Sequence, residues 1–486
     1  MIHIYTKEVV MEVIKKIYNV SPYIFIIIIA FSTLLWELGI NGDELWNYNF
    51  IRNISYGLIP YRDFNMVQTP FAAYFGAFWM LLFGNGFIVY KMMGVILMIA
   101  TFSLLYYIIK ESSKCRELAF AVTVFYMLLI YNTWIYNYNT LNLLIIILFF
   151  YIKLFKKNSL RNEIIIAFLI GMMPLIKQTT GICVLLSYGI NLFFDKNRTK
   201  KSFCIQWVAM LTPSALYLVY LIVSGTLLEF VDYTIVGIKY FTHKITYIDF
   251  MFSSLVHFCI GIGFIVICCM TIKNLINTDN EDRKSQVIRF FIISVAAGIV
   301  AYPITDISHI LLAIMPFMIC WFLSMKEIKV TIKEGAIIYL FSSVLAVLAL
   351  PIVVKIDDNQ KWSSLKNFEH ILVDEEMEQR IVRVCDFIKD KKREGIDVYI
   401  TNESACVYMI PLDLYNKNFD MLLLGNLGSN TVEDLLNVDD DSLFLVYKNN
   451  EIINWQCHFE LIDYITENYE CVGEINNYDI YRKNFE

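Results

Sequence analysis

The sequence predicts a polytopic α-helical membrane protein that is followed by a small α/β domain. Mean hydropathy is +0.55 over 486 residues, with 57% hydrophobic and only 18% charged residues, whereas about a quarter of an average soluble domain is charged. The apolar residues lie in long runs before residue 355, and residues 356–486 have the composition of a soluble domain. These observations exclude a soluble enzyme, a disordered chain, a nucleic-acid binder and a small disulfide scaffold.

Apolar runs of spanning length account for most of residues 1–355. They are 20–40, 87–109, 117–134, 140–157, 203–223, 252–272, 287–303, 309–324 and 333–354. The stretch 162–194 is long enough for two further spans and is interrupted by the polar sequence 177–181. We therefore expect about eleven spans, two of them short.

The distribution of basic residues predicts the orientation of the chain. A helix over the sixteen residues 69–84 would reach only about 24 Å, so we expect this segment to lie at the interface without crossing. Before the tail, the inner segments then hold 21 Lys and Arg and the outer segments hold six, and the remaining 13 lie in the tail. The positive-inside rule predicts a multi-pass plasma-membrane protein with a cytoplasmic N-terminus, a first outer loop at 41–86 and an extracytoplasmic domain at 356–486.

The pattern of residues 356–486 is typical of a small α/β domain. A charged amphipathic stretch at 374–394 predicts a helix, and a second helix is expected at 456–469. Strand-like runs occur at 397–401, 420–424 and 443–447. The sequence of this domain contains no phosphate-binding glycine loop and no metal-ligand cluster, and we expect it to be a lid or a recognition module.

Polar residues are concentrated in the predicted outer loops, so a functional site is expected on that face. Asp43 and Glu44 directly follow the first span. Two such carboxylates could hold a divalent cation, or one could take a proton from an attacking hydroxyl. The structural alternative is that Asp43 caps an interfacial helix over 44–57, with Glu44 in its first turn.

Together with this acidic pair, residues 57–84 resemble the first outer loop of the GT-C superfamily of integral-membrane glycosyltransferases. The resemblance is closest to relatives of protein O-mannosyltransferases and aminoarabinose transferases. Residues 60–64 (PYRDF) and 69–71 (TPF) look like the proline-containing stretch of that loop. The His or Lys common before a double proline is replaced by Gln68 before Thr69-Pro70. Weaker outer-face motifs at 174–179 and 302–309 also look like those of such transferases, and the resemblance covers the membrane part.

The resemblance implies an enzyme that moves a sugar from a polyprenyl-phosphate carrier to an extracytoplasmic hydroxyl during cell-envelope glycan biosynthesis. The acceptor would be a glycan, a lipid or a protein. Asp43 matches the first acidic residue of the family and is expected to be the general base, with Glu44 in support. If a divalent cation such as Mg or Mn takes part, this pair would hold it. The second outer loop lacks the acidic residue that relatives often carry, which favours transfer with weak metal assistance or none.

A cation is needed near the leaving phosphate, and the candidates are Lys177, Arg62 and Arg52. Lys177 stands out because an ammonium between two short apolar helices is costly without a partner. The alternative is that Lys177 only extends its ammonium group to the membrane–water interface. The candidates for acceptor or sugar binding are Asp63, Gln68, Asn137, Asp306 and His309, with the alternative that Asp306 caps a helix beginning near His309.

Two other functions are compatible with this composition. A transporter or flippase for a lipid-linked glycan would show internal repeats and charged residues at mid-membrane, and the sequence shows no repeat and few such charges. A non-catalytic acceptor-binding protein of the same fold would have the same sequence pattern. The expected partners are a polyprenyl-phosphate-linked sugar, an envelope acceptor and the lipid bilayer, and not nucleic acid.

Overall fold

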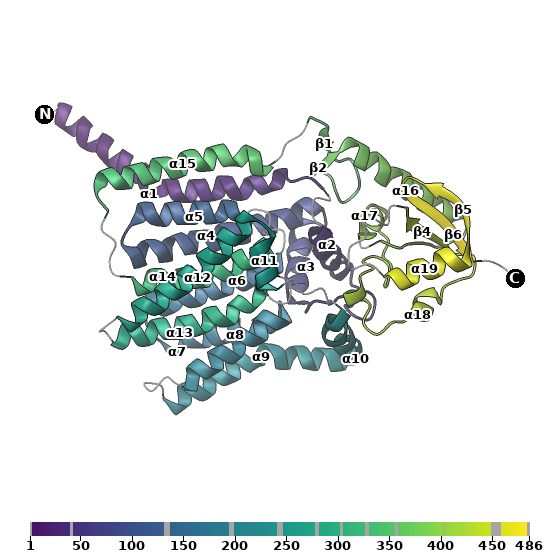
Figure 1. Ribbon diagram of the computed structural model, residues 1–486, viewed down its shortest axis with the longest axis horizontal. Helices are drawn as coiled ribbons and strands as arrows, with labels where there is room; N and C mark the ends of the chain where they lie inside the picture. The colour runs from purple at the N-terminus through teal and green to yellow at the C-terminus, as the bar shows by residue number, and fades with distance from the viewer. Residues whose placement is uncertain are drawn as a thin grey trace.

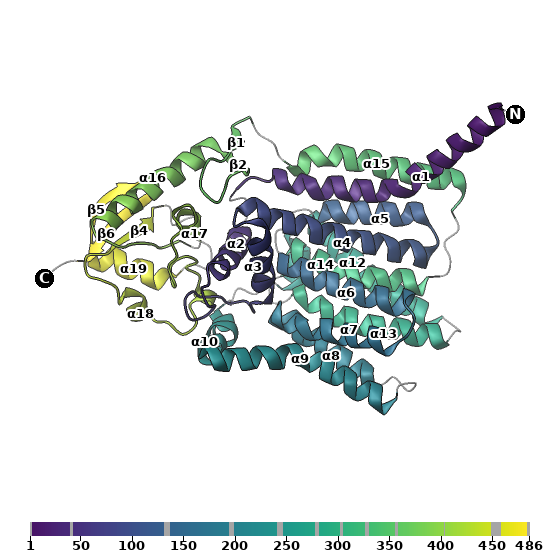
Figure 2. The same cartoon turned by 180° about the vertical axis from the view of Figure 1, so that it is seen from behind.

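A bundle of long helices carries a small mixed domain at one end (Figure 1). The computed structural model describes residues 2–38, 42–130, 137–193, 199–240, 246–277, 281–301, 305–325, 330–354, 358–402, 404–448 and 458–483. The N-terminal helix extends from the end of the bundle that is farthest from the mixed domain (Figures 1 and 2).

The bundle helices follow the apolar runs of the sequence. They are α1 (Ile2–Ser32), α4 (Phe87–Ser113), α5 (Arg116–Leu129), α6 (Asn137–Phe155), α7 (Leu160–Met172), α8 (Gln178–Phe193), α9 (Lys200–Ser224), α12 (Leu255–Ile276), α13 (Glu281–Ala297), α14 (Ile307–Ser324) and α15 (Ile332–Val354). Short helices α10 (Leu227–Val231) and α11 (Tyr247–Ser253) lie on the segment between α9 and α12.

Within the described residues, seven helices are long and apolar enough to cross a membrane. They are α1, α4, α9, α12, α13, α14 and α15. Helices α5 to α8 lie in the same bundle (Figures 1 and 2) but are not among these seven. The chain therefore has the helices of a multi-pass membrane protein, and the total of about eleven spans stays a prediction.

Helices α2 (Gly42–Ser55) and α3 (Phe71–Phe83) lie at the end of the bundle, next to the C-terminal domain (Figures 1 and 2). Helix α3 runs across the direction of the bundle helices (Figures 1 and 2), and it stays a prediction that residues 69–84 do not cross the membrane. Every residue of α2 from Glu44 to Asn53 is buried, although these residues include charged and amide side chains. Partners for some of these polar groups lie on two sides of α2, since Lys91 of the bundle pairs with Glu44 and the Leu414 carbonyl of the C-terminal domain accepts from Arg52.

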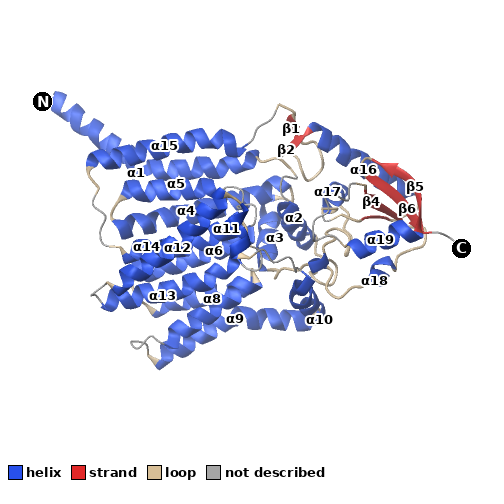
Figure 3. Cartoon of the chain, in the orientation of Figure 1, coloured by secondary structure: helices blue, strands red, loops and turns tan. Residues whose placement is uncertain are grey.

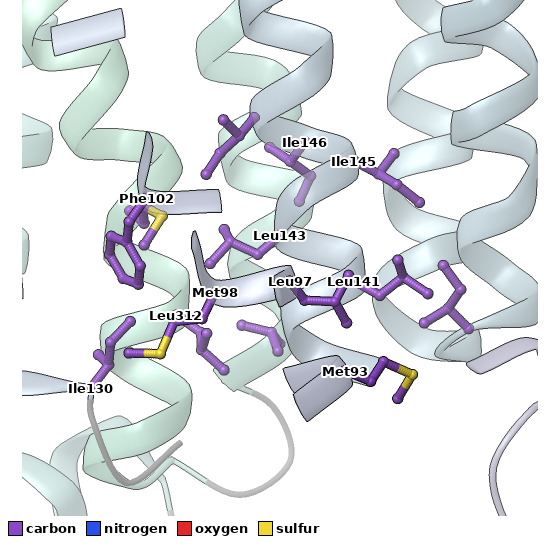
Figure 4. Packing of buried hydrophobic residues seen from close by; sticks show 14 of the residues in the cluster. Met93, Leu97, Met98, Phe102, Ile130, Leu141, Leu143, Ile145, Ile146 and Leu312 are labelled. Carbon is purple, nitrogen blue, oxygen red and sulfur yellow. The ribbon is translucent and has the colours of Figure 1, made fainter. Parts of the chain in front are cut away.

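The main hydrophobic cluster links the bundle to the C-terminal domain. Figure 4 shows Met98 and Phe102 of α4 beside Leu143 of α6 and Leu312 of α14. The same cluster continues into the C-terminal part of the chain through Phe368, Val373, Cys406, Met421 and Leu423. The end of the bundle and this part of the chain thus share one apolar core.

The C-terminal domain is a sheet with a helix on each face (Figure 3). Its elements are β1 (Gln360–Trp362), β2 (Leu372–Asp374), α16 (Glu375–Arg393), β3 (Val398–Ile400), α17 (Cys406–Met409), α18 (Val432–Leu436), β4 (Leu443–Tyr447), α19 (Phe459–Asn468), β5 (Tyr469–Ile475) and β6 (Tyr478–Lys483). The four-stranded sheet has the order β3-β4-β6-β5, with β3 and β4 parallel and the other pairs antiparallel.

Strand β4 shows why two helices cover this sheet. Its alternate residues point to opposite faces, so Leu443 and Leu445 pack with Ile388 of α16, while Phe444 and Val446 pack in the cluster formed with α19. All four side chains are buried.

Most of the predicted elements of this domain are present, but the strand expected at 420–424 was wrong. Residues 374–394, 397–401, 443–447 and 456–469 contain α16, β3, β4 and α19. Residues 420–424 instead form a turn that leads into the short 3-10 helix η8 (Leu424–Asn426). Their apolar side chains are buried because Met421 and Leu423 pack in the core shared with the bundle.

Hydrogen bonds donated by backbone amides join the first loop and its flanking helices to the C-terminal domain. The amide of Leu38 donates to the carbonyl of Leu372 (2.7 Å), and the amide of Phe87 donates to that of Asn367 (2.8 Å). The Asn426 side chain accepts from the amide of Val67 (3.0 Å). The first loop and the C-terminal domain therefore lie on the same face of the bundle.

The side of the membrane on which this face lies can be tested by labelling with a membrane-impermeant maleimide. We expect Asp386→Cys in α16 to be labelled in intact cells, and Glu281→Cys at the start of α13 only after permeabilisation; both parent side chains are exposed. Mass spectrometry of the alkylated peptides separates these sites from native cysteines, and the exposed Cys471 is an internal control. The reverse pattern would show that the predicted orientation is wrong.

Candidate functional site

Lys177 lies at the turn between two short helices, as the sequence predicted. Pro174 is in a single 3-10 turn, η3 (Met173–Leu175), that follows α7, and α8 begins immediately after Lys177. The amide of Gly181 donates to the Lys177 carbonyl (2.9 Å). A Cβ at Gly181 would overlap the backbone of Met173 and Pro174, so glycine allows α8 to start against the turn and holds Lys177 there.

The Lys177 ammonium is surrounded by residues from the starts of three other helices. It donates to Oδ1 of Asn139 in the first turn of α6 (3.4 Å). The negative charges of Asp306, which precedes α14, and Asp43, in the first turn of α2, both act on it. Burial lowers the pKa of Lys177 to about 8, and the charges of Asp306 and Asp43 partly oppose this shift. We call Asp43, Asn139, Lys177 and Asp306 the Lys177 cluster.

The Lys177 cluster is electrostatically suited to an anion. Helices α6 and α8 begin at the cluster with no acidic residue in their first turns, so a partial positive charge of roughly +0.5 at each of these two starts adds to that of the Lys177 ammonium. The start of α14 already has a negative partner, because the Asp306 carboxylate accepts from the His309 amide. Helix N-termini also present backbone N–H groups to anions.

Asp43 does not cap α2, because the helix already includes Gly42. Asp43 lies half-buried in the first turn, and its carbonyl accepts from the side chain of Asn47 (2.7 Å). A Cβ at Gly42 would be 3.3 Å from Oγ of Ser404. The C-terminal domain therefore reaches the start of α2.

Glu44 forms a buried pair with Lys91 of α4, with 3.9 Å between Oε1 and Nζ. The Lys91 ammonium also donates to the Trp36 carbonyl (2.8 Å). Burial raises the pKa of Glu44, and the charge of Lys91 opposes this shift. An ammonium beside Glu44 disfavours a cation shared by Asp43 and Glu44, and the described residues contain no group of three or more His, Cys, Asp or Glu that could hold a metal ion.

The two arginine candidates lie in different surroundings. Arg52 is buried, donating to Oδ1 of Asn49 (2.9 Å) and to the Leu414 carbonyl (3.1 Å), so it joins α2 to the C-terminal domain. Arg62 is exposed and forms two hydrogen bonds with Asp63. These hydrogen bonds hold the pKa of Asp63 below its usual range, and the same carboxylate accepts from the Ile59 amide (2.7 Å).

Asp306 has the capping role that the sequence left as an alternative. It accepts from the His309 amide (2.8 Å) and lies 2.9 Å from Nδ1 of the same residue. Its position before α14 also places it near Lys177. The Gln68 carbonyl accepts from the hydroxyl of buried Tyr61 (2.7 Å), and the side chain of Asn137 lies outside the described residues.

Sequence reasoning missed three contacts that position the cluster. The first is the hydrogen bond from Lys177 to Asn139, which lies in the first turn of α6 and was not among the predicted site residues. Gln178 donates to the carbonyl of Val67 (3.0 Å), and Asn426 accepts from the amide of that residue. The position of Gln178 beside Lys177 was a usable signal, whereas Asn426 gave none because it is far away in sequence.

The Glu44–Lys91 pair predicts a large stability effect. Lys91→Met should lower the free energy of unfolding by on the order of 3 kcal/mol, because it leaves a buried carboxylate without its charge partner. Thermal unfolding in detergent measures this change. Lys114→Met is the matched control, since this exposed lysine just after the same helix pairs with Glu111 at 3.4 Å and should contribute about 1 kcal/mol or less. Equal losses of unfolding free energy for the two substitutions would contradict the large contribution expected of the Glu44–Lys91 pair.

Comparison with known proteins gives one family for the central part of the chain. Residues 67–224 match the family model of dolichyl-phosphate-mannose-protein mannosyltransferases. The match covers α3 to α9 and includes Lys177, whereas Asp43 and Asp306 lie outside it. No curated protein matches the chain. The family match confirms the resemblance over this part of the chain: residues 67–224 are similar to a membrane glycosyltransferase family of the GT-C type.

Proposed function

We propose that the protein transfers a sugar from a polyprenyl-phosphate carrier to a hydroxyl of a cell-envelope acceptor, and that the Lys177 cluster is the reaction site. The observation that carries this proposal is the meeting of a half-buried ammonium, two carboxylates and four helix starts on the face that bears the first loop. A glycosyl phosphate needs a cationic site for its anion and a base for the acceptor.

In the proposed reaction, the acceptor oxygen attacks the anomeric carbon while Asp43 takes the hydroxyl proton. The bond between the anomeric carbon and the phosphate oxygen breaks, and its electron pair stays on the phosphate. The attack occurs opposite the leaving group, so the configuration at the anomeric carbon is inverted. Lys177 and the starts of α6 and α8 stabilise the charge that the phosphate gains.

Glu44 has a positioning role in this proposal. Its pair with Lys91 fixes the start of α2 against α4, and so fixes the direction of Asp43. The proposed reaction uses no divalent cation, because the Lys91 ammonium lies beside Glu44. Ser404 lies near Gly42, and we assign the C-terminal domain to the side from which the acceptor approaches.

A groove supports binding of the apolar carrier chain. It has a volume of about 540 Å³ and lies between the end of α1, the start of α4 and β1. Its lining includes Ile28, Phe31, Leu35, Ile88 and Trp362. Ile88 precedes Lys91 by one helical turn, so the groove lies close to the pair that positions α2. We assign the isoprenoid chain to this groove because burial of apolar surface stabilises the complex.

Asp43→Asn should reduce transfer by about 10²–10⁴-fold, as expected for loss of a general base. The purified protein would be incubated with a panel of polyprenyl-phosphate sugars, and release of polyprenyl phosphate would be measured. Asp249→Asn is the control, because Asp249 accepts from Thr246 in the capping box of α11, and losing a cap costs about 1 kcal/mol of stability. Near-normal turnover of folded Asp43→Asn would remove Asp43 as the base.

Lys177→Ala should raise KM for the carrier and also lower kcat, because the phosphate is anionic in the ground state and gains charge in the transition state. In the unmodified protein kcat/KM should fall as the pH rises through about 8, where the ammonium loses its proton. Lys177→Arg should partly restore both constants and keep kcat/KM high at alkaline pH, since a guanidinium stays charged. This assignment would be contradicted if kcat/KM of Lys177→Arg still fell as the pH rose through about 8. It would also be contradicted if Lys177→Ala left KM and kcat unchanged while Arg62→Ala abolished transfer.

A further inference from the structure

A second site lies at the opposite end of the bundle, where α6, α7, α8 and α13 enclose a cavity of about 340 Å³. Helices α6 and α8 begin at the Lys177 cluster, and α13 leads through η6 (Gly298–Ala301) toward Asp306. The end of α6, the end of α8 and the start of α13 therefore lie together, away from the cluster. Figures 1 and 2 show these helices side by side along the bundle.

Basic side chains predominate around this cavity. Lys153, Lys156, Lys157 and Arg289 line it, against the acidic residues Glu163 and Asp282. The polar partners of Glu163 lie within the protein: it accepts from Ser202 (2.7 Å) and Gln206 (2.6 Å) and lies 3.9 Å from Lys153. The formal charges of the lining sum to a net positive value, so an anion would be attracted.

The inner wall of the same cavity is apolar. Phe149 and Ile152 of α6, Ile166 of α7, Leu192 of α8 and Phe290 of α13 line it. The rings of Phe149 and Phe290 meet edge to face, with centroids 5.6 Å apart. A cavity with basic residues and an apolar wall fits a ligand that joins an anionic group to a hydrocarbon chain.

We propose that this cavity binds the phosphate group of an anionic phospholipid from the leaflet at this end of the bundle. Arginine presents two parallel N–H donors to phosphate oxygens, and lysine supplies a point charge. Basic pockets between transmembrane helices are suited to anionic lipid headgroups. Free phosphate shares the headgroup chemistry but would make no use of the apolar wall. This inference does not depend on the proposed transfer reaction.

The test uses the full chain in a neutral detergent with added phosphatidylglycerol, phosphatidylcholine or inorganic phosphate. Binding to the folded state raises the unfolding temperature, and we expect phosphatidylglycerol to give the largest rise. The variant Lys157→Gln/Arg289→Gln should lose most of that rise. The control variant is Lys110→Gln/Lys114→Gln, which removes two basic residues near the far end of α4, where both lysines pair with Glu111, and it should keep the rise.

Three outcomes would overturn the inference. These are an equal rise with inorganic phosphate, an equal rise with phosphatidylcholine, and equal responses of the cavity and control variants. A second measurement counts the phosphatidylglycerol molecules that remain bound to the intact protein in native mass spectrometry. Fewer bound molecules in the cavity variant than in the control would support the site even if the cavity variant were less stable.

Discussion

The partial burial of the Lys177 ammonium is the constraint on which the arrangement of this face depends. A cation that is partly removed from water is unfavourable without negative partners. Here the charges of Asp306 and Asp43 and the oxygen of Asn139 compensate it. These partners come from widely separated parts of the chain, so the requirement to compensate one charge fixes where α2, α6, α8 and α14 begin relative to each other.

The C-terminal domain is part of this arrangement rather than a separate appendage. Helix α2 is polar in composition, yet it is buried along most of its length because the bundle covers one side and the C-terminal part of the chain covers another. Arg52 donates a hydrogen bond to the Leu414 carbonyl, and the Asn426 side chain accepts one from the amide of Val67. Movement of this domain would therefore disturb the first loop and the start of α2.

The features that are local in sequence could be predicted, and those that depend on tertiary contacts could not. Apolar run length predicted the bundle helices, and the polar sequence at 177–181 predicted the turn at Lys177. The pairing of Glu44 with Lys91 was not predictable, because the two residues belong to different helices, α2 and α4, that meet only through the tertiary fold. The strand expected at 420–424 was wrong for the same reason, since its apolar pattern reflects packing against the bundle and not pairing in the sheet.

The position of the carrier phosphate tests the central claim most directly. A cryo-electron microscopy map of the protein with a bound polyprenyl phosphate would show it. The account predicts phosphate density in contact with the Lys177 ammonium, between the starts of α6, α8 and α14 and facing the Asp43 carboxylate. Density at the exposed Arg62–Asp63 pair, with none beside Lys177, would contradict it.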